Sequence, residues 1–355
     1  MSLPRPFPST RSIRIVVLAS ALVVAHAGAS ATTESPRPPP QPPTGPGGVA
    51  APFDRVVATR FGEPPTGYWL YEPADADGNV AAGGLEPLPL VIFLHGFTAV
   101  DPVSYLIWIE HITRRGAVVL YPDYQTPTPL AVAPEEFLPN VVTAVRHALA
   151  QLERGDRAPI DPSKVAVVGH SMGGILAVNL ASIAEGAGLP TPKAIMPIEP
   201  GGCRECGTGP PGFGAPLADL SRIPASTYAI VVVGEEDNVV GDTGARLIWS
   251  GMTAVPFDRR DLIRINSDRY GEPALIADHF MPLTGSVLGT LDALDWYGTW
   301  KLFDGLTACA FENIGCDEAL GGTSFQRWMG EWSDGTPVTP ADVTDDPDAW
   351  TGAAT

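Results

Sequence analysis

The sequence predicts an α/β fold in which a mostly parallel central sheet has helices on both faces. Short apolar runs alternate along the chain with longer amphipathic segments, and this order is typical of parallel strands joined by helical crossovers. Several of the short runs are apolar at nearly every position, as in strands buried on both faces. The chain has 355 residues, 45% of them hydrophobic, which is enough to bury one large core.

The elements follow from these runs. The expected strands are Gly67–Glu72, Leu88–Leu94, Ala117–Tyr121, Lys164–Val168, Ala194–Ile198, Tyr228–Val233 and Leu262–Asn266. The expected helices are Ser104–Arg115, Pro134–Arg154, Met172–Glu185, Gly244–Gly251 and Ser286–Leu302. Within the second helix, Pro134 suits the first turn, and the two glutamates that follow it favour the positive end of the helix dipole.

The amino terminus reads as a secretory signal peptide covering residues 1–31. Three arginines precede an apolar run over residues 15–25 that is too short to cross a bilayer. Ala29-Ser30-Ala31 fits a cleavage site, and Ala25-His26-Ala27 is a second possibility. We therefore expect a secreted or periplasmic protein, with no stable membrane association once the signal is removed.

Three regions are expected after the signal. Residues 32–52 are rich in proline and glycine and read as an extended, unpacked linker. Residues 53–333 would form the catalytic domain. Residues 334–355 are acidic and rich in Pro and Thr, which predicts a low-complexity tail that wraps the surface or is disordered.

The net charge of the chain narrows the kinds of binding partner that are expected. A net charge of -18 argues against nucleic acid and anionic membranes as partners.

Four cysteines in an exported chain are expected to pair, and we favour two local disulfides, Cys203–Cys206 and Cys309–Cys316, over crossed ones. A redox or zinc reading of the C-x-x-C pair is less favoured, because no second such pair accompanies it.

The most specific motif is Gly169-His170-Ser171-Met172-Gly173. It follows an apolar, β-branched run and opens a helical segment, which is the strand–turn–helix context of a nucleophile elbow. The turn is so sharp that side chains in place of its two glycines would collide with it. Ser171 is therefore the candidate nucleophile, and the amide of the next residue, Met172, is a candidate donor to an oxyanion.

A serine hydroxyl needs a base to take its proton, and His279 is the candidate. His26 lies in the signal, His111 and His147 lie in expected helices, His95 is expected to bond nearby backbone, and His170 points elsewhere on the turn. Asp237, just past an expected strand, would orient the imidazole. Asp242 and Glu199 remain alternatives for this acid, and Asp278 is expected to cap a loop.

Four segments carry a family resemblance: HGF at 95–97, GHSMGG at 169–174, GEEDNVV at 234–240 and DHF at 278–280. In these the chain resembles the α/β-hydrolase superfamily, and within it the secreted esterases of the cutinase, polyester hydrolase and dienelactone hydrolase-like branch. The order Ser, Asp, His is that of the superfamily. The resemblance implies the α/β-hydrolase fold, and it implies that the Phe97 amide is the second oxyanion donor.

The resulting hypothesis is a serine carboxylester hydrolase that works through an acyl-enzyme on a small or polymeric ester. Phe97, Trp108 and Phe280 are candidates to line the substrate pocket, with Trp108 equally placed to be a core residue. No cofactor or catalytic metal is expected, because no metal-ligand spacing and no nucleotide-binding pattern is present. An exported peptidase and a non-catalytic binding protein on the same fold are the alternatives. The oligomeric state stays unknown.

Overall fold

The computed structural model describes residues 34–82, 86–207, 213–285 and 288–350. The chain divides into two compact units, and nearly all of the described residues belong to the second, Ser35–Thr355. The predicted signal peptide, residues 1–31, lies outside the described residues. Within the described part of the chain, no helix combines the length and the apolar composition that a membrane crossing requires.

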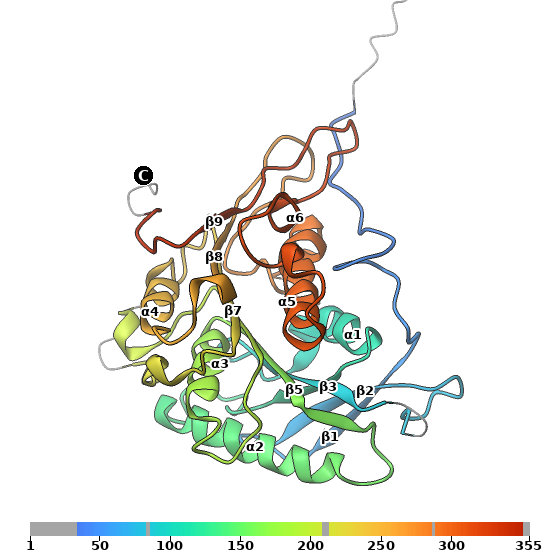
Figure 1. Ribbon diagram of the computed structural model, residues 1–355, viewed down its shortest axis with the longest axis vertical. Coiled ribbons are helices and arrows are strands. Elements are labelled where there is room, and N and C mark those ends of the chain that lie inside the picture. Colours follow the sequence, from blue (N-terminus) through green and yellow to red (C-terminus); the bar gives the residue numbers. More distant parts are fainter. Residues whose placement is uncertain (1–33, 83–85, 208–212, 286–287, 351–355) are drawn as a thin grey trace, which may run out of the picture. The chain divides into compact units, whose positions relative to one another are not determined.

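The described strands of this unit form one nine-stranded sheet in the order β1-β2-β4-β3-β5-β6-β7-β8-β9 (Figure 1). From β4 to β8 all neighbours are parallel, whereas β1, β2 and β9 make the antiparallel pairings at the two edges. The strands are β1 Val56–Phe61, β2 Tyr68–Pro73, β3 Leu88–Leu94, β4 Val118–Pro122, β5 Ile160–His170, β6 Ala194–Ile198, β7 Tyr228–Gly234, β8 Arg260–Ile265 and β9 Asp342–Thr344.

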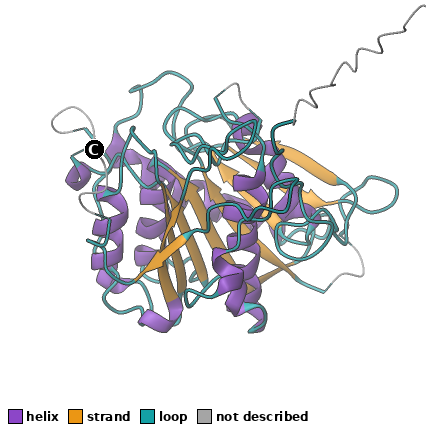
Figure 2. Cartoon of the chain, turned by 90° about the horizontal axis from the view of Figure 1, so that it is seen from above, coloured by secondary structure: helices purple, strands orange, loops and turns teal. Residues whose placement is uncertain are grey.

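Helices cover both faces of the sheet (Figure 2). The main helices are α1 Leu106–Arg114, α2 Phe137–Leu152, α3 Met172–Ile183, α4 Thr243–Gly251, α5 Lys301–Glu312 and α6 Ser324–Arg327. One cluster of buried apolar side chains joins the sheet to α2, α3 and α4, and a second joins it to α1 and α5. The predicted mostly parallel α/β fold is confirmed.

The strands form where the sequence is continuously apolar. Every residue of β4 and β6 is buried, and β3, β5 and β7 are buried toward their carboxyl ends. Such runs have no polar side to leave in water, so they occupy the middle of a sheet covered on both faces. This places the carboxyl ends of β5, β6 and β7 beside one another at one edge of the sheet.

Two strands were not expected from the sequence. Strand β1 is only half-buried over most of its length, and polar residues interrupt its apolar ones. Strand β9 has three residues and lies in the segment that was expected to be a low-complexity tail. Its pairing with β8, together with buried Val338 and Ala341, anchors part of that segment to the unit.

The last long helix begins later than the sequence indicates. A π-helix, η6 (Leu294–Trp300), leads directly into α5, which ends at Glu312, whereas the prediction was residues 286–302. Residues 286–287 lie outside the described residues. The Asp292 side chain accepts a hydrogen bond from the Leu294 amide at 2.8 Å, so it caps the start of the helical segment.

The proline-rich segment 36–50 packs against the domain, which differs from the unpacked linker that its composition predicts. The amide of Gly47 donates to Asp304 Oδ2 at 2.7 Å, and the Trp296 indole donates to the Pro39 carbonyl at 3.2 Å. Ser333 donates its amide to the Arg37 carbonyl at 2.9 Å. The segment therefore docks both by donating, through Gly47, and by accepting, through carbonyls that include that of Pro39, which keeps its carbonyl although it lacks an N–H.

Candidate active site

Ser171 lies at the sharp turn between β5 and α3. Its backbone has φ 55° and ψ -120°, a conformation that non-glycine residues rarely adopt. A Cβ on Gly169 would overlap the carbonyl of Gly173, and a Cβ on Gly173 would overlap the carbonyls of Leu94 and His95. Gly169 is therefore required for the end of β5 to pack against the start of α3, and Gly173 for the turn to pack against the end of β3.

His279 and Asp237 meet Ser171 at this edge of the sheet. The Nε2 atom of His279 lies 3.1 Å from the Ser171 hydroxyl oxygen, and its Nδ1 lies 2.8 Å from Asp237 Oδ2. All three residues are at least nine-tenths buried. The loop after β8 presents the histidine and the turn after β7 presents the aspartate, so residues far apart in the chain form one hydrogen-bonded row.

The carboxyl group of Asp237 is held in its ionised form. Burial raises the pKa of Asp237, but hydrogen bonding and the charge of His279, with two backbone donors, outweigh burial and lower that pKa overall. The two donors are the amides of Val239 and Val240, each 2.9 Å from Oδ1. The backbone thus fixes Oδ1 of Asp237, while Oδ2 faces the imidazole of His279. This arrangement favours the tautomer of His279 that has its proton on Nδ1.

The other candidate acids take different positions. Asp242 lies at the start of α4 within 3.9 Å of Arg246, away from the row. Asp278 accepts a hydrogen bond from the Phe280 amide at 2.8 Å and caps that turn. Glu199 follows β6 and its Oε2 lies 3.9 Å from His279 Nδ1, so it belongs to the same site at a longer distance.

The turn after β3 has one amide without a partner. Gly96 donates its amide to the Tyr105 hydroxyl, and Thr98 donates to Gln125 Oε1 at 2.7 Å. Among the described residues, the Phe97 amide has no hydrogen-bond partner, and the same holds for the Met172 amide at the start of α3. Two unpaired N–H groups beside a nucleophile are what an oxyanion requires.

His95 holds that turn in place. Its two ring nitrogens lie 2.6 Å from the Gly96 carbonyl and 2.7 Å from the Asp123 carbonyl, and its ring stacks on Tyr124. Burial lowers the pKa of His95 to about 4, and the backbone contacts offset only part of this. The residue is therefore neutral at pH 7, and its single N–H donates to only one of these two carbonyls. It contacts the backbone, which is the role expected from the sequence.

Behind the row lies a second layer made of His170, Tyr105 and Glu199. The Tyr105 hydroxyl lies 2.7 Å from His170 Nδ1, and His170 Nε2 lies 2.8 Å from the carbonyl of His279. Burial, with the neighbouring charge of His279, lowers the pKa of His170 to about 3. A neutral His170 with its proton on Nε2 donates to the His279 carbonyl and so helps to fix the position of His279.

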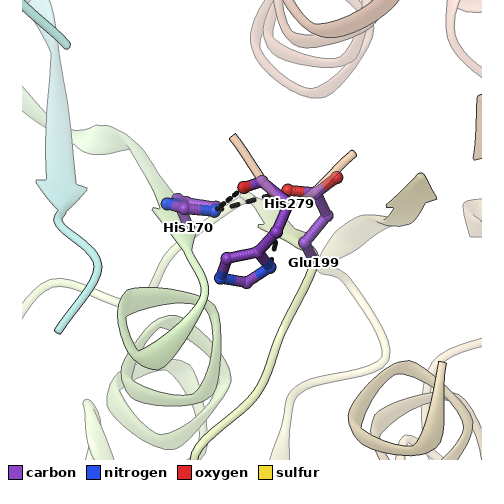
Figure 3. A group of neighbouring side chains, drawn as sticks. All are labelled: His170, Glu199 and His279. Carbon is purple, nitrogen blue, oxygen red and sulfur yellow. Dashed lines mark hydrogen bonds and ion pairs between the residues drawn. The ribbon is translucent and has the colours of Figure 1, made fainter. Parts of the chain in front are cut away.

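His170, Glu199 and His279 form the one group among the described residues whose geometry would allow a shared metal ion, with ligand atoms within 4.8 Å of one another (Figure 3). The nitrogens are already engaged: His170 Nε2 faces the His279 carbonyl and His279 Nδ1 faces Asp237. A nitrogen that donates a proton has no lone pair for a metal. The contacts therefore fit a proton-holding network better than a metal centre.

Aromatic side chains lie on the segments that adjoin Ser171 and His279 in the sequence or in the fold. The ring of Phe97 lies 5.5 Å from that of Phe213 and 6.5 Å from that of Phe137, and Phe280 lies 5.7 Å from the His279 ring. Phe97 and Phe280 are half-buried. The loop containing Phe213 also holds the Cys203–Cys206 disulfide, and residues 208–212 of that loop lie outside the described residues.

Trp108 does not lie at the site. It is fully buried and packs edge-on against Phe93 and Phe303, because it sits on the face of α1 that covers the sheet. Trp108 is therefore a core residue, which was the alternative to its role in a substrate pocket. The second pair of cysteines, Cys309 and Cys316, is also bonded, closing the end of α5.

Three neighbours of the site were not predicted from the sequence: Tyr105, Gln125 and Phe213. Each lies in a segment without a motif, and Tyr105 meets His170 across 65 residues of sequence. Nothing in the local pattern marks them. Tyr105 and Gln125 are brought to the site by the register of β3, β4 and β5, which places the segments after β3 and β4 beside the end of β5. Phe213 lies in the loop between β6 and β7.

The central part of the chain matches a known family. A family model described as the alpha/beta hydrolase fold matches residues 91–237. The match begins in β3, includes Ser171 and ends at Asp237, so the loop containing His279 lies beyond it. A search of curated proteins found no match to the chain.

Proposed function

The chain belongs to the α/β-hydrolase superfamily, and from this premise we propose that it is a secreted serine carboxylester hydrolase with Ser171, His279 and Asp237 as its catalytic triad. The observation that supports the proposal most is the row of contacts at 3.1 and 2.8 Å that joins these three side chains. Finer placement in a cutinase-like branch stays a prediction.

The contacts define a sequence of steps. His279 Nε2 takes the hydroxyl proton as Ser171 Oγ attacks the ester carbonyl carbon, and Asp237 stabilises the imidazolium that forms. The carbonyl oxygen becomes an oxyanion that the amides of Phe97 and Met172 hold, each worth about 3 kcal/mol in the transition state. His279 then gives the proton to the leaving alcohol, and water, deprotonated by the same base, hydrolyses the acyl-enzyme.

An ester substrate is favoured by the surroundings of the triad. Phe97, Phe213 and Phe280 offer apolar surface for an acyl or aromatic group. The described residues form one sheet-centred unit with no further domain to restrict or align a peptide. The peptidase and the non-catalytic binding protein are therefore retained only as outcomes of the test.

The test compares the wild-type chain with Ser171→Ala on p-nitrophenyl butyrate, on a matched p-nitroanilide and with a fluorophosphonate probe. We expect the variant to lose about 10⁶-fold in kcat and all labelling. The control is Ser182→Ala, which removes another buried hydroxyl from α3 without touching the triad. Amide turnover above ester turnover would favour the peptidase, and a folded but unlabelled wild-type chain would favour the binding protein.

Secretion is proposed on two features. Residues 1–31 have the composition of a signal peptide, and Cys203–Cys206 and Cys309–Cys316 both lie at bonding distance. Expressed with its own leader, the chain should accumulate outside the cytoplasm without residues 1–31, as amino-terminal sequencing of the mature protein would reveal. Retention of the full chain in the cytoplasm would contradict this.

A further inference from the structure

Glu199 is a buried carboxyl group for which the triad itself has no use. It follows β6 directly and is fully buried. Neither of its oxygens has a hydrogen-bond partner within the described chain. Burying an unpaired carboxyl costs free energy, so its presence at this depth calls for a reason.

The backbone around Glu199 is adapted to keep the side chain in this place. Its φ is 45°, which is unfavourable for any residue other than glycine. A Cβ at Gly234, the end of β7, would lie 2.4 Å from the Ala277 carbonyl oxygen and 2.6 Å from Glu199 Oε1, so the glycine leaves room for both. Strain and a missing side chain are both consistent with selection for a function.

The carboxyl faces the base from behind. Glu199 Oε2 lies 3.9 Å from His279 Nδ1 and 3.3 Å from His170 Nε2. Figure 3 draws the three side chains together. Asp237, from the neighbouring strand end, lies 2.8 Å from the same Nδ1. A shift of about 1 Å in Glu199 or His279 is therefore enough to bring this second carboxyl into hydrogen-bond range.

Its surroundings disfavour a second negative charge. The titratable groups facing Glu199 are His170 at the end of β5, Tyr105 before α1, Asp237 after β7, and Asp278 and His279 in the loop after β8. Burial, and then the charges of Asp237 and Asp278, raise the pKa of Glu199 well above its usual value. His170 is neutral and does not offset these charges, so ionising both carboxyls together is disfavoured.

We propose that Glu199 is a second positioning acid for His279, neutral while Asp237 is ionised and able to supply the charge facing Nδ1 when Asp237 is lost. This deepens the proposed function and rests on it. In a chain without Asp237, Glu199 releases its proton to solvent, and its carboxylate then accepts the N–H of Nδ1. Either carboxylate, Asp237 after β7 or Glu199 after β6, can thus keep the His279 imidazole oriented.

The kinetic test uses Asp237→Ala, Glu199→Gln and the double variant, with kcat/KM on p-nitrophenyl butyrate measured from pH 5 to 10. Losing a triad acid alone ordinarily costs about 10⁴-fold. We expect the kcat/KM of Asp237→Ala to fall by less than this factor. We also expect its kcat/KM to rise about tenfold per pH unit until the pH at which Glu199 is ionised. The double variant should be at least about tenfold slower again and lack that rise. Glu199→Gln alone should lose less rate than Asp237→Ala, because Asp237 still faces Nδ1.

Equal rates and equal pH profiles for Asp237→Ala and the double variant would overturn the proposal. A merely structural Glu199 would lower all rates without removing the pH rise. Circular dichroism and fluorophosphonate labelling show whether each variant is folded. If Glu199→Gln does not fold, Glu199→Asp in the Asp237→Ala background is the substitute, because the shorter acid recedes from Nδ1 and should remove most of the rescued rate.

A second measurement does not depend on turnover. At pH 7 the infrared difference between the wild-type chain and Glu199→Gln should contain the C=O stretch of a protonated carboxyl group, and Asp237→Ala should shift its titration to lower pH. Absence of that band would refute the neutral acid. If the wild-type chain has the band but neither hydrolyses esters nor reacts with the probe, the proposed function is refuted. The proposal that Glu199 is neutral beside an ionised Asp237 would still hold.

Discussion

Ser171 lies at a turn that can pack only because two neighbouring residues have no side chain. Gly169 and Gly173 leave room for carbonyl groups that would otherwise collide with a Cβ. Neither contact involves a flexible side chain that could move aside, because the facing atoms are backbone of Gly173, Leu94 and His95. The serine conformation at φ 55° is thus imposed by packing on both sides of the turn.

Replacing Gly173 with alanine should therefore separate the turn from the end of β3. We expect Gly173→Ala to lose at least about 2 kcal/mol in unfolding free energy and most of its esterase activity, since the new methyl group is overpacked against backbone. Urea denaturation and p-nitrophenyl ester turnover measure the two effects. Gly186→Ala is the matched control, because the nearest atom to its Cβ lies 3.7 Å away. Equal stability of both variants would contradict the steric argument.

Asp261 makes stability depend on pH in a direction opposite to most carboxyl groups. Burial raises the pKa of Asp261 to about 6, although hydrogen bonds from Gln326 and Gly321 offset part of the effect. The folded pKa exceeds the unfolded value of 3.8, so the protonated form favours folding. Its contribution is complete below pH 3.8 and is lost as the pH rises through about 6.

Asp261→Asn, which stays neutral, should gain stability over wild type as the pH rises from 4 to 8. The gain has an upper limit of about 3 kcal/mol, because one unit of pKa shift corresponds to about 1.4 kcal/mol. Urea denaturation at pH 4, 6 and 8 gives the difference, with exposed Asp258→Asn as the control. A stability difference that does not change with pH would rule out this role for Asp261.

Among the elements, α5 fixes the carboxyl-terminal segment through a buried cation. Lys301 at its start donates from Nζ to the carbonyls of Phe325, Gln326 and Trp328. These carbonyls lie at the end of α6, where a helix leaves acceptors unpaired. Burial lowers the pKa of Lys301 to about 8, so the ammonium form persists at neutral pH while it serves all three.

Lys301→Met keeps the length of the side chain and removes its three donors. We expect a loss of about 3 kcal/mol in unfolding free energy, because carbonyls left buried without partners are costly. The control is Lys164→Met: Lys164 pairs with Glu312 near the surface, and its loss should cost less than about 1 kcal/mol. Thermal and urea unfolding of the two variants decide the matter, and equal losses would show that the carbonyl contacts contribute little.

At the scale of the whole molecule, the sequence predicts the parallel centre of the sheet better than its edges. β3 and β6 begin and end where the apolar runs do, because burial on both faces demands an unbroken run. β1 and β9 lie at the edges, where one side meets solvent and the apolar signal is diluted by polar residues. Their pairing is set by contacts with β2 and β8, which no local pattern reveals.

The same division applies to the site. Ser171 was predictable because its turn is a local steric problem that only a short list of residues solves. Trp108 and Glu199 were ambiguous, since a tryptophan on a helix and an acid after a strand are each compatible with two environments. Trp108 lies in the core because α1 packs on the sheet. Glu199 lies near His279 because β6 is adjacent to β7.

The segment 36–50 belongs energetically to the whole domain although its composition resembles a linker. A chain beginning at residue 51 lacks the contacts to Asp304, Trp296 and Ser333. We expect its Tm to fall by about 5–10 °C relative to a chain beginning at residue 34, since a few kcal/mol shift a domain of this size by that amount. Scanning calorimetry of the two chains tests this, and an unchanged Tm would mean that the segment docks without stabilising the domain.

Glu199 and Asp237 give one imidazole nitrogen two acidic neighbours from adjacent strand ends. In an evolving lineage, such redundancy lets the acid migrate: a descendant that loses one carboxylate keeps enough turnover for selection to refine the other. Homologues that differ in which strand bears the acid would then be connected by single substitutions, with no inactive ancestor between them.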